Sequence, residues 1–256
     1  MTVYSPSSAT ARRDRLQYGI WYLTVAIAAG LTAWFLTFLD WPVVLRSWPI
    51  MWRGLQVSFG LTAVSILGGL ILGAALAAMR LSPLRPARYV SLAFTETVRA
   101  TPQLMVIFWI YLSYPALTGH AINSWIGAAV ALTLIAAAFL GEVIRGGLLS
   151  IPRVQSESST LLGLSRTQAF LFILLPQACR NMLPALIATV IMMFKTTSLV
   201  FVIGLIDFFR AVMIINNRDF APLTLYTVLA LVYFFCCYAL SSLLRLVDPK
   251  YTITSG

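Results

Sequence analysis

The chain has 256 residues, of which 60% are hydrophobic and only 10% are charged, whereas ordinary soluble domains carry roughly 25% charged residues. This composition excludes an ordinary soluble domain, and the sequence lacks the ~10-residue alternating segments of a membrane β-barrel. The formal net charge of +10 comes mainly from basic residues in short connectors between apolar runs. That distribution is typical of membrane topology and not of nucleic-acid binding.

Several kinds of chemistry are excluded by what the sequence does not contain. No Gly-x-x-x-x-Gly-Lys-Ser/Thr loop is present, so any ATP chemistry must belong to another chain. Three cysteines (Cys179, Cys236 and Cys237) lack metal-ligand spacing, and His120, predicted to lie in a loop, is the only histidine. We therefore predict no metal site, cofactor or catalytic residue on this chain, which is not expected to be an enzyme.

A bilayer-spanning helix needs ~20 mainly apolar residues, and six stretches of the chain meet or approach this requirement. They are residues 21–39, 55–79, 103–117, 125–140, 183–206 and 221–244. We therefore predict an all-α integral membrane protein with about six transmembrane helices. Residues 1–20 and 247–256 are predicted to be terminal tails.

The first and third of these stretches are atypical. No Ala-x-Ala-like cleavage site follows residues 21–39, which are predicted to be a retained helix and not a signal peptide. The third stretch is short, but residues 89–98 predict a helical segment before it. Thr101-Pro102 predicts a break or kink between the two.

Orientation follows from the arginines and lysines, because basic residues near helix ends stay in the cytoplasm. With alternating sides, thirteen of them lie on one side of the membrane and four on the other, and Lys195 lies within a stretch. Both termini are therefore predicted to be cytoplasmic, as an even number of crossings requires.

The longest connector, residues 145–181, is cytoplasmic by this count and carries helix signals. Gly163 suits the left-handed position that ends a helix, and Ser165 with Gln168 predicts a capping box that begins the next one. The second helix is predicted to end near Pro176, because proline interrupts the hydrogen-bond ladder. Two short helices held at this face need a partner surface, either lipid headgroups or another protein.

The same connector resembles the cytoplasmic EAA loop of bacterial ABC importer permeases. In that family Glu-Ala-Ala is followed, after three residues, by Gly and, after nine more, by Ile-x-Leu-Pro. The matching residues here, with serines in place of both alanines, are Glu157, Ser158, Ser159, Gly163, Ile173, Leu175 and Pro176. Stretches that begin at Glu96 (ETVRATPQLMVIFWIYLSYP), Gly141 (GEVIRGGLLSIPRVQSE) and Lys195 (KTTSLVFVIGLIDFFR) resemble the polar amino-acid branch of the family.

The resemblance covers residues 55–246, including a coupling loop at 150–181, and implies a five-helix type I importer core. Residues 21–39 add an N-terminal helix to that core. The resemblance further implies a bacterial inner-membrane dimer of identical or paralogous permease subunits. Separate ATPase subunits would hold ATP and Mg and dock on the coupling loop, while a periplasmic binding protein delivers the substrate. For Glu157, the alternatives are an ion pair with the ATPase or a solvated carboxylate favoured by the helix dipole.

Lys195 lies among apolar residues, where an unpaired ionisable group is costly and is a functional candidate by default. Lys195, Thr196, Thr197 and Ser198 are therefore candidates for the translocation path, and a structural role in the bundle is equally open. Gly68, Gly69 and Gly73 form a small-residue face that suits close helix packing, within the subunit or across a dimer. Pairs at i, i+3 spacing predict local ion pairs, namely Glu96 with Arg99 and Glu142 with Arg145.

The stretch from Leu205 to Arg210 resembles that of glutamate and aspartate permeases, and Lys195 would repel a cationic side chain in a low dielectric. These features favour glutamate, aspartate or an amide as the substrate. A permease for basic amino acids is the alternative. An ion-coupled secondary transporter is a further rival, although it usually shows internal repeats and intramembrane carboxylates, and a membrane enzyme is a weaker one.

Overall fold

The structure, a computed structural model, describes residues 8–247, and every regular element in this part of the chain is a helix. Four segments are long and apolar enough to cross a membrane: α2 (Trp41–Leu81), α5 (Ser124–Leu149), a continuous segment over residues 166–203, and α10 (Pro222–Val247). Two shorter apolar helices are α4 (Gln103–Thr118) and residues 21–36 of α1 (Ser8–Leu36). The predicted all-α membrane fold is confirmed, and the number of crossings stays a prediction.

The continuous segment over residues 166–203 changes its helical form along its length. It comprises α7 (Arg166–Gln168), the π-helical η1 (Ala169–Leu174), α8 (Leu175–Thr196) and the 3₁₀-helical η2 (Thr197–Ile203). The remaining helices are α3 (Arg85–Ala100), α6 (Arg153–Leu161) and α9 (Phe208–Asp219).

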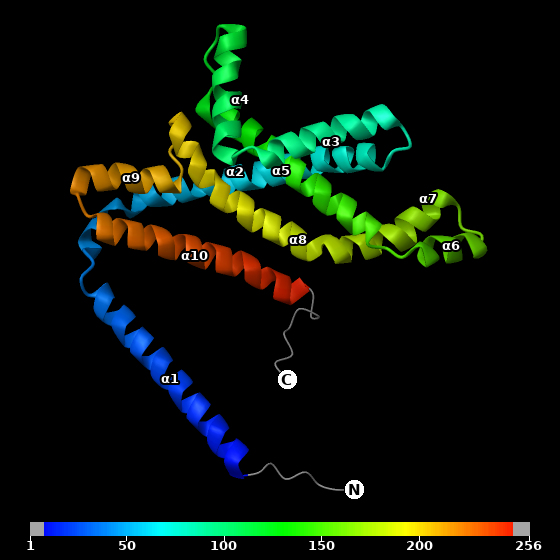
Figure 1. The fold of residues 1–256 in the computed structure, drawn as a ribbon. Helices are drawn as coiled ribbons and strands as arrows, with labels where there is room; N and C mark the ends of the chain where they lie inside the picture. Colours follow the sequence, from blue (N-terminus) through cyan, green and yellow to red (C-terminus); the bar gives the residue numbers. More distant parts are fainter. Residues whose placement is uncertain (1–7, 248–256) are drawn as a thin grey trace.

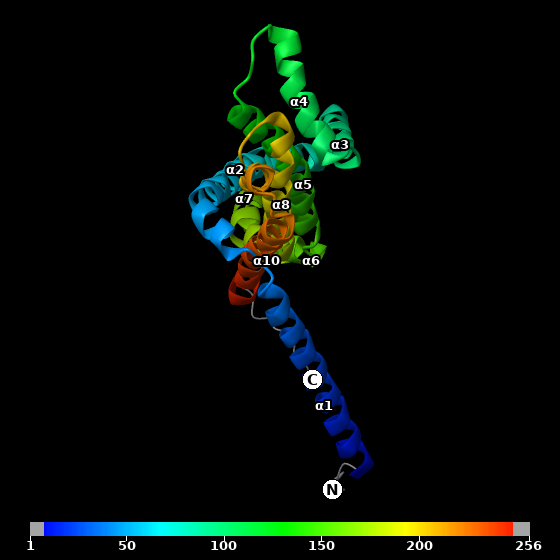
Figure 2. The same ribbon diagram turned by 90° about the vertical axis from the view of Figure 1, so that its left-hand side faces the viewer.

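The long helices lie alongside one another and define two ends of the molecule (Figure 1). The corner between α2 and α3 and the α6–α7 segment lie at one end, and α9 with the first turns of α2 lies at the other. Helix α4 leaves the body at a steep angle, and α1 diverges from it, as the rotated view also shows (Figure 2).

Several helices are longer than the apolar stretches that predicted them. Helix α1 begins at Ser8, inside the predicted tail of residues 1–20, and α2 begins at Trp41 and not at residue 55. With 41 residues, α2 is about 62 Å long, roughly twice the ~30 Å of a hydrocarbon core. An apolar run marks only the part of a helix that lies in the hydrocarbon core. Its length therefore underestimates the length of a helix that continues beyond the core. Residues 1–7 and 248–256, and with them most of the predicted tail 247–256, lie outside the described residues.

The central packing is between α2 and α5, which approach closely because both carry small residues. A Cβ atom added at Gly69 would lie 2.6 Å from the Ala136 Cβ, and one at Gly73 would lie 2.9 Å from the Gly141 backbone nitrogen. The glycine face of α2 therefore packs within the subunit, which decides between the two alternatives that the sequence left open.

A second core packs the first turns of α2 against helices from the C-terminal part of the chain. Val43 and Met51 of α2 pack with Phe194 of α8, Phe208 of α9 and Leu225 of α10, all of them buried. Helix α9 is absent from the predicted elements, because five of its 12 residues are polar and it lies between two longer apolar runs. Tertiary packing against α2 buries its apolar face, including Ala211, Val212 and Ile215.

The predicted break at Thr101-Pro102 is confirmed. Helix α3 ends at Ala100 and α4 begins at Gln103, with Thr101 and Pro102 in extended backbone conformations between them. Proline fixes its own φ and moves the preceding residue out of the helical region. The segment that enters the bundle as α3 therefore changes direction before it continues as α4.

Candidate functional site

The connector between α5 and α8 forms the first predicted short helix, α6, and begins a second helix at Arg166. Helix α6 ends in a Schellman turn: the Leu164 amide donates to the Ser159 carbonyl oxygen at 3.1 Å and the Gly163 amide to that of Thr160 at 3.0 Å. Gly163 has a φ of +77°, which only glycine adopts at low cost. The sequence prediction for this turn is confirmed.

Beyond the turn, Ser165 and Gln168 form the predicted capping box. The Gln168 backbone amide donates to the Ser165 hydroxyl at 3.3 Å, and the Ser165 backbone amide donates to the Gln168 side-chain oxygen at 2.9 Å. Reciprocal capping of this kind satisfies two backbone donors that a helix start leaves free. The end of α6 and the start of α7 are therefore both fixed by local hydrogen bonds, and together they form the α6–α7 corner.

The predicted coupling residues differ in exposure. Glu157 and Ser158 are exposed, whereas Ser159 is buried and its hydroxyl donates to the Ser156 carbonyl oxygen at 2.7 Å. Glu157 is the fifth residue of α6, and the first turn of that helix has no acidic residue. Because the dipole effect is confined to the first turn, the helix dipole does not explain this carboxylate.

Large apolar side chains are exposed beside the turn. Leu161 and Leu162 are 88% and 76% exposed. Exposed apolar groups next to a charged residue are typical of a protein interaction site. This surface, formed by Glu157, Ser158, Leu161, Leu162 and Gly163, is called the loop surface below.

The prediction that the second helix ends near Pro176 is wrong. The helix continues from Arg166 through Pro176 to Ile203. Immediately before the proline the helix is π-helical, and the Leu175 amide donates to the Phe170 carbonyl oxygen, five residues back. A π turn widens the helix and inserts an extra residue; we attribute to it the passage of the proline ring without a break. Ile173 and Leu175 are half-buried, and Pro176 is exposed.

The connector is also attached to the bundle by side chains. The Asn181 side-chain amide on α8 donates to the Ser150 hydroxyl at the end of α5 at 2.8 Å, and that hydroxyl donates to the Gly147 carbonyl oxygen. The Gln177 side-chain amide donates to the Ile173 carbonyl oxygen at 2.9 Å. These bonds attach the first turns of α8 to the end of α5 and to η1. The unbroken helix that contains α8 begins at Arg166, directly after the turn that carries the loop surface.

The second predicted set, Lys195 to Ser198, lies where α8 changes into the 3₁₀-helical η2. Lys195 is exposed, and the Ser198 hydroxyl donates to the Lys195 carbonyl oxygen at 2.8 Å. Thr197 is buried and donates to the Phe194 carbonyl oxygen at 2.8 Å. The four residues are thus not equivalent, because Thr196 and Thr197 are engaged in the bundle and Lys195 is directed away from the buried core.

Gln103 joins this set and is missing from the sequence prediction. The Thr196 hydroxyl lies 2.9 Å from the Gln103 side-chain oxygen and 2.9 Å from the Met192 carbonyl oxygen, and its single proton is shared between these two acceptors. Gln103 is the first residue of α4, directly after the Thr101-Pro102 break. The sequence did contain a signal for Gln103 as a candidate residue, because it is a polar residue at a break in an apolar run. The interrupted path of α3 and α4 and the change from α8 to η2 therefore meet at one side-chain hydrogen bond.

Asp207 is a second buried polar residue that the sequence prediction omits. Its carboxylate caps α9 by accepting from the Phe209 amide at 3.1 Å and the Arg210 amide at 3.0 Å. Burial raises the pKa of Asp207 from 3.8 to about 6, against the lowering effect of these backbone hydrogen bonds. The Phe208 amide donates to the Ser58 hydroxyl on α2, so the start of α9 is attached to α2. An aspartate before a helical stretch is a cap signal that the sequence did contain.

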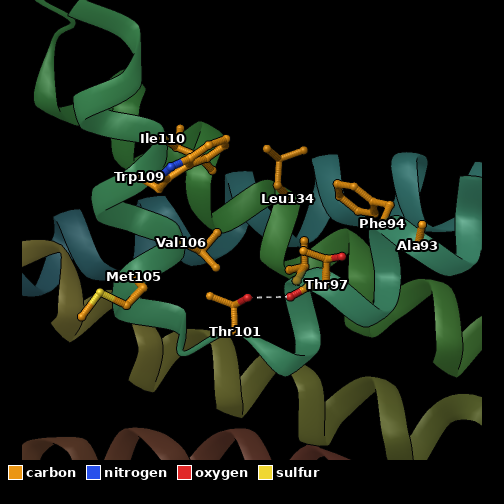
Figure 3. Close-up of a pocket in the computed structure, with 10 residues that line it drawn as sticks. Ala93, Phe94, Thr97, Thr101, Met105, Val106, Trp109, Ile110 and Leu134 are labelled. Atoms are coloured by element: carbon orange, nitrogen blue, oxygen red, sulfur yellow. Dashed lines mark hydrogen bonds between the residues drawn. The ribbon is translucent and has the colours of Figure 1, made fainter. Parts of the chain in front are cut away.

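A cavity of about 640 Å³ lies between α3, α4 and α5 (Figure 3). Trp109, Phe94 and Leu134 contribute to its apolar wall, and the Thr101 hydroxyl at its edge donates to the Thr97 carbonyl oxygen at 2.7 Å. None of the residues that line it is charged. The lining lacks ionic partners for the carboxylate and ammonium groups of an amino acid, so this cavity is a weaker candidate for the polar path than the Gln103–Thr196 contact.

A bundle of long apolar helices with an exposed helix corner at one end defines a multi-pass integral membrane protein. The chain belongs to the family of binding-protein-dependent transport system inner membrane components, which matches residues 65–253, well over half of its length.

Relatives and solved structures agree with this family. The chain is 35% identical over 202 residues to the glutamate/aspartate import permease protein GltK of Escherichia coli O157:H7, covering 76% of this chain and 90% of the relative. It is 30% identical to the glutamine transport system permease protein GlnP of Escherichia coli K12 (84% and 98% covered). It is also 30% identical to the arginine transport system permease protein ArtQ of Bacillus subtilis (83% and 97% covered).

Among solved structures, one described as an amino acid ABC transporter with histidines superposes with a TM-score of 0.77. The two chains are 29% identical, and the superposition covers 83% of this chain and 99% of that one.

Proposed function

We propose that this chain is the membrane permease subunit of an ATP-driven importer of a polar amino acid in the bacterial inner membrane. The observation that carries the proposal is the loop surface, an exposed helix end whose turn is followed directly by the unbroken helix over residues 166–203. Family membership and the named activities of the relatives support it. The chain itself carries out no covalent chemistry.

The loop surface is the proposed docking site of a separate ATPase subunit, which holds ATP and Mg. Glu157 supplies a charge for an ion pair, and Leu161 and Leu162 supply apolar contact area, the combination found at protein interfaces. Because an unbroken helix runs from Arg166, directly after the loop surface, to Ile203, movement of the ATPase would be transmitted to the Lys195–Ser198 region. A few kcal/mol of differential binding is sufficient to shift a two-state equilibrium between outward and inward access.

The remaining partners follow from the same proposal. A second permease subunit, identical or paralogous, completes the path, and a periplasmic binding protein delivers the substrate. Lys195 and Ser198 are the proposed path residues, whereas Thr196, held by Gln103, and Thr197 position the turn between α8 and η2.

The proposed substrate is glutamate, aspartate or an amide. The relatives named for glutamate/aspartate and for glutamine support it, and an exposed Lys195 attracts a carboxylate and repels a cation. The arginine permease relative keeps basic amino acids as the second candidate. Uptake of radiolabelled glutamate, aspartate, glutamine, arginine and histidine by the reconstituted complex tests the choice. Uptake confined to arginine or histidine would refute the proposed substrate and leave the permease function intact.

Glu157→Gln and Gly163→Pro test the docking role. Proline cannot adopt a φ of +77° and loses the amide that donates to Thr160, so Gly163→Pro disrupts the corner, and Glu157→Gln removes only a charge. We expect tenfold or greater loss of stimulated ATP hydrolysis for the first and a smaller loss for the second, with normal membrane insertion. Glu96→Gln is the matched control, because Glu96 is an exposed carboxylate away from the loop surface. Normal stimulation in both loop variants would show that this loop does not couple.

A further inference from the structure

Two arginines line a concave pocket at the corner where α2 turns into α3. The pocket has a volume of about 340 Å³ and is lined by Arg80, Arg88, Tyr89 and Leu92. Tyr89 is 67% exposed. The pocket therefore combines two guanidinium groups, a phenol and an aliphatic wall within a single concavity.

The positive charge of this pocket has no acidic partner of its own. Within the described residues, no ion pair involves Arg80 or Arg88. Glu142 is near enough to Arg80 for electrostatic attraction, but its carboxylate already accepts two hydrogen bonds from Arg145, at 2.7 and 3.0 Å. The nearby N-terminus of α3 has no side-chain cap, and its dipole adds positive potential.

The position of Arg80 along α2 predicts that the pocket lies near the depth of lipid headgroups. The uncharged part of α2 runs from residue 54 to residue 79 and is followed by Arg80. These 26 residues span about 39 Å, slightly more than the ~30 Å of the hydrocarbon core. Arg80 is therefore the first charge beyond the core, at the same end of the molecule as α6 and α7 (Figure 1).

We propose that this pocket binds the phosphate group of an anionic phospholipid from the adjacent leaflet. Arg80 and Arg88 would donate to the phosphate oxygens, for which the guanidinium fork is well matched. The Tyr89 hydroxyl is a further donor, and Leu92 lies beside the apolar part of the lipid. Basic pockets between transmembrane helices are sites of this type.

The shape of the pocket favours a lipid over a free phosphate ion. A free ion needs no aliphatic wall, and the volume exceeds what one phosphate fills. The pocket is also placed where lipid phosphates are concentrated and where soluble anions must compete with them. The proposal depends on the position of Arg80 along α2 and not on the transport function.

Lipid binding to the purified complex in detergent, measured by native mass spectrometry, tests the proposal. Phosphatidylglycerol is the probe, and phosphatidylcholine is the neutral comparison. We expect the wild-type complex to retain phosphatidylglycerol selectively, and Arg80→Gln with Arg88→Gln to weaken its first binding step by roughly tenfold or more. Lysine at both positions should restore part of the affinity, because charge is kept and the bidentate geometry is lost.

Arg85→Gln is the matched control. Arg85 lies in the same corner and carries the same charge, but it does not line the pocket. We expect its effect on phosphatidylglycerol binding to stay within about twofold, as attraction to the surface changes only weakly with one charge that lies outside the pocket. An equal loss in Arg85→Gln would overturn the proposal, because it would indicate bulk charge alone. Equal retention of phosphatidylcholine, or displacement of the lipid by millimolar inorganic phosphate, would also overturn it. Thermal unfolding of each variant verifies the fold.

Discussion

At the scale of single residues, Phe220 has an unusual backbone conformation. It follows α9 with a φ of +52°, and among the described residues it is the only non-glycine residue with positive φ. Its side chain is 87% exposed, so few packing contacts offset the strain. A left-handed conformation costs a residue with a Cβ atom roughly 1–2 kcal/mol. Glycine is the residue that this helix-ending position prefers.

Phe220→Gly should therefore stabilise the protein. The relief of strain is partly offset by the greater freedom of glycine in the unfolded chain, so we expect a net gain of about 0.5–1 kcal/mol. Thermal unfolding in detergent is the measurement. Phe220→Ala is the control, since it removes the ring and keeps the Cβ atom. A gain of equal size in the alanine variant would mean that the exposed ring, and not the backbone, was responsible.

Asp207 is the residue whose titration affects stability. Its pKa is raised from 3.8 to about 6 by burial, so the folded protein binds this proton more tightly than the unfolded chain does. The resulting stabilisation is fully present below about pH 4 and is lost as the pH rises through 6, by an amount on the order of 1–3 kcal/mol.

Asp207→Asn retains a side-chain oxygen to cap α9 and removes the charge. We expect the difference in unfolding free energy, variant minus wild type, to increase between pH 4 and pH 7 and to level off above that range. Thermal or denaturant unfolding across this pH range measures it. A constant difference across the range would show that Asp207 keeps its ordinary pKa. The comparison cancels the titration of all other groups that the two proteins share.

At the scale of elements, the close approach of α2 and α5 depends on glycine. A Cβ atom at Gly73 would lie 2.9 Å from the Gly141 nitrogen and 3.1 Å from the Ala137 carbonyl oxygen, both backbone atoms that cannot move aside easily. A Cβ atom at Gly60, in the same helix, would have no neighbour within 4 Å. The same substitution at the two positions therefore has opposite expected effects.

Gly73→Ala should destabilise the protein by roughly 1–3 kcal/mol, the usual cost of overpacking. Gly60→Ala should stabilise it by up to ~1 kcal/mol, because alanine is the better helix former. Unfolding of both variants in detergent tests the pair. Equal effects in the two variants would contradict the close packing of α2 on α5.

At the scale of the whole molecule, charge is unevenly distributed between the two ends. The basic residues of the first turns of α2 and of α9, at the end opposite α6 and α7 (Figure 1), are Arg46, Arg53, Arg210 and Arg218. The basic residues of the other end are more numerous: Arg80, Arg85, Arg88, Arg145, Arg153, Arg166 and Arg180. Asp219 accepts from Arg218 and pairs with Arg46 at 2.8 Å, which further reduces the net charge of the α9 end.

This distribution predicts that the end with α6 and α7, and both termini, face the cytoplasm. A fluorescent reporter that folds only in the cytoplasm should be active when fused after Gly256. Alkaline phosphatase, which folds only in the periplasm, should be inactive there and active when inserted after Phe220. The reverse pattern would invert the topology.

The sequence by itself determined the all-helical membrane class, the corner at Gly163 with its capping box, the break at Thr101-Pro102 and the i, i+3 ion pair of Glu142 with Arg145, at 2.7 Å. These features depend on residues within a few positions of one another, or on composition summed over a span. Their physical causes, namely backbone sterics, local capping and transfer into lipid, act without knowledge of the rest of the fold.

Only the tertiary structure decided which distant residues meet. Thr196 bonds Gln103 across 93 positions, Gly73 faces Gly141, and α9 acquires a buried side only where α2 covers it. The continuation of the helix through Pro176 belongs to the same group, since a π turn has no local sequence signal comparable to a cap. Such contacts depend on the rotation and the relative shift of whole helices, which the packing of all helices sets jointly and no single stretch of sequence specifies.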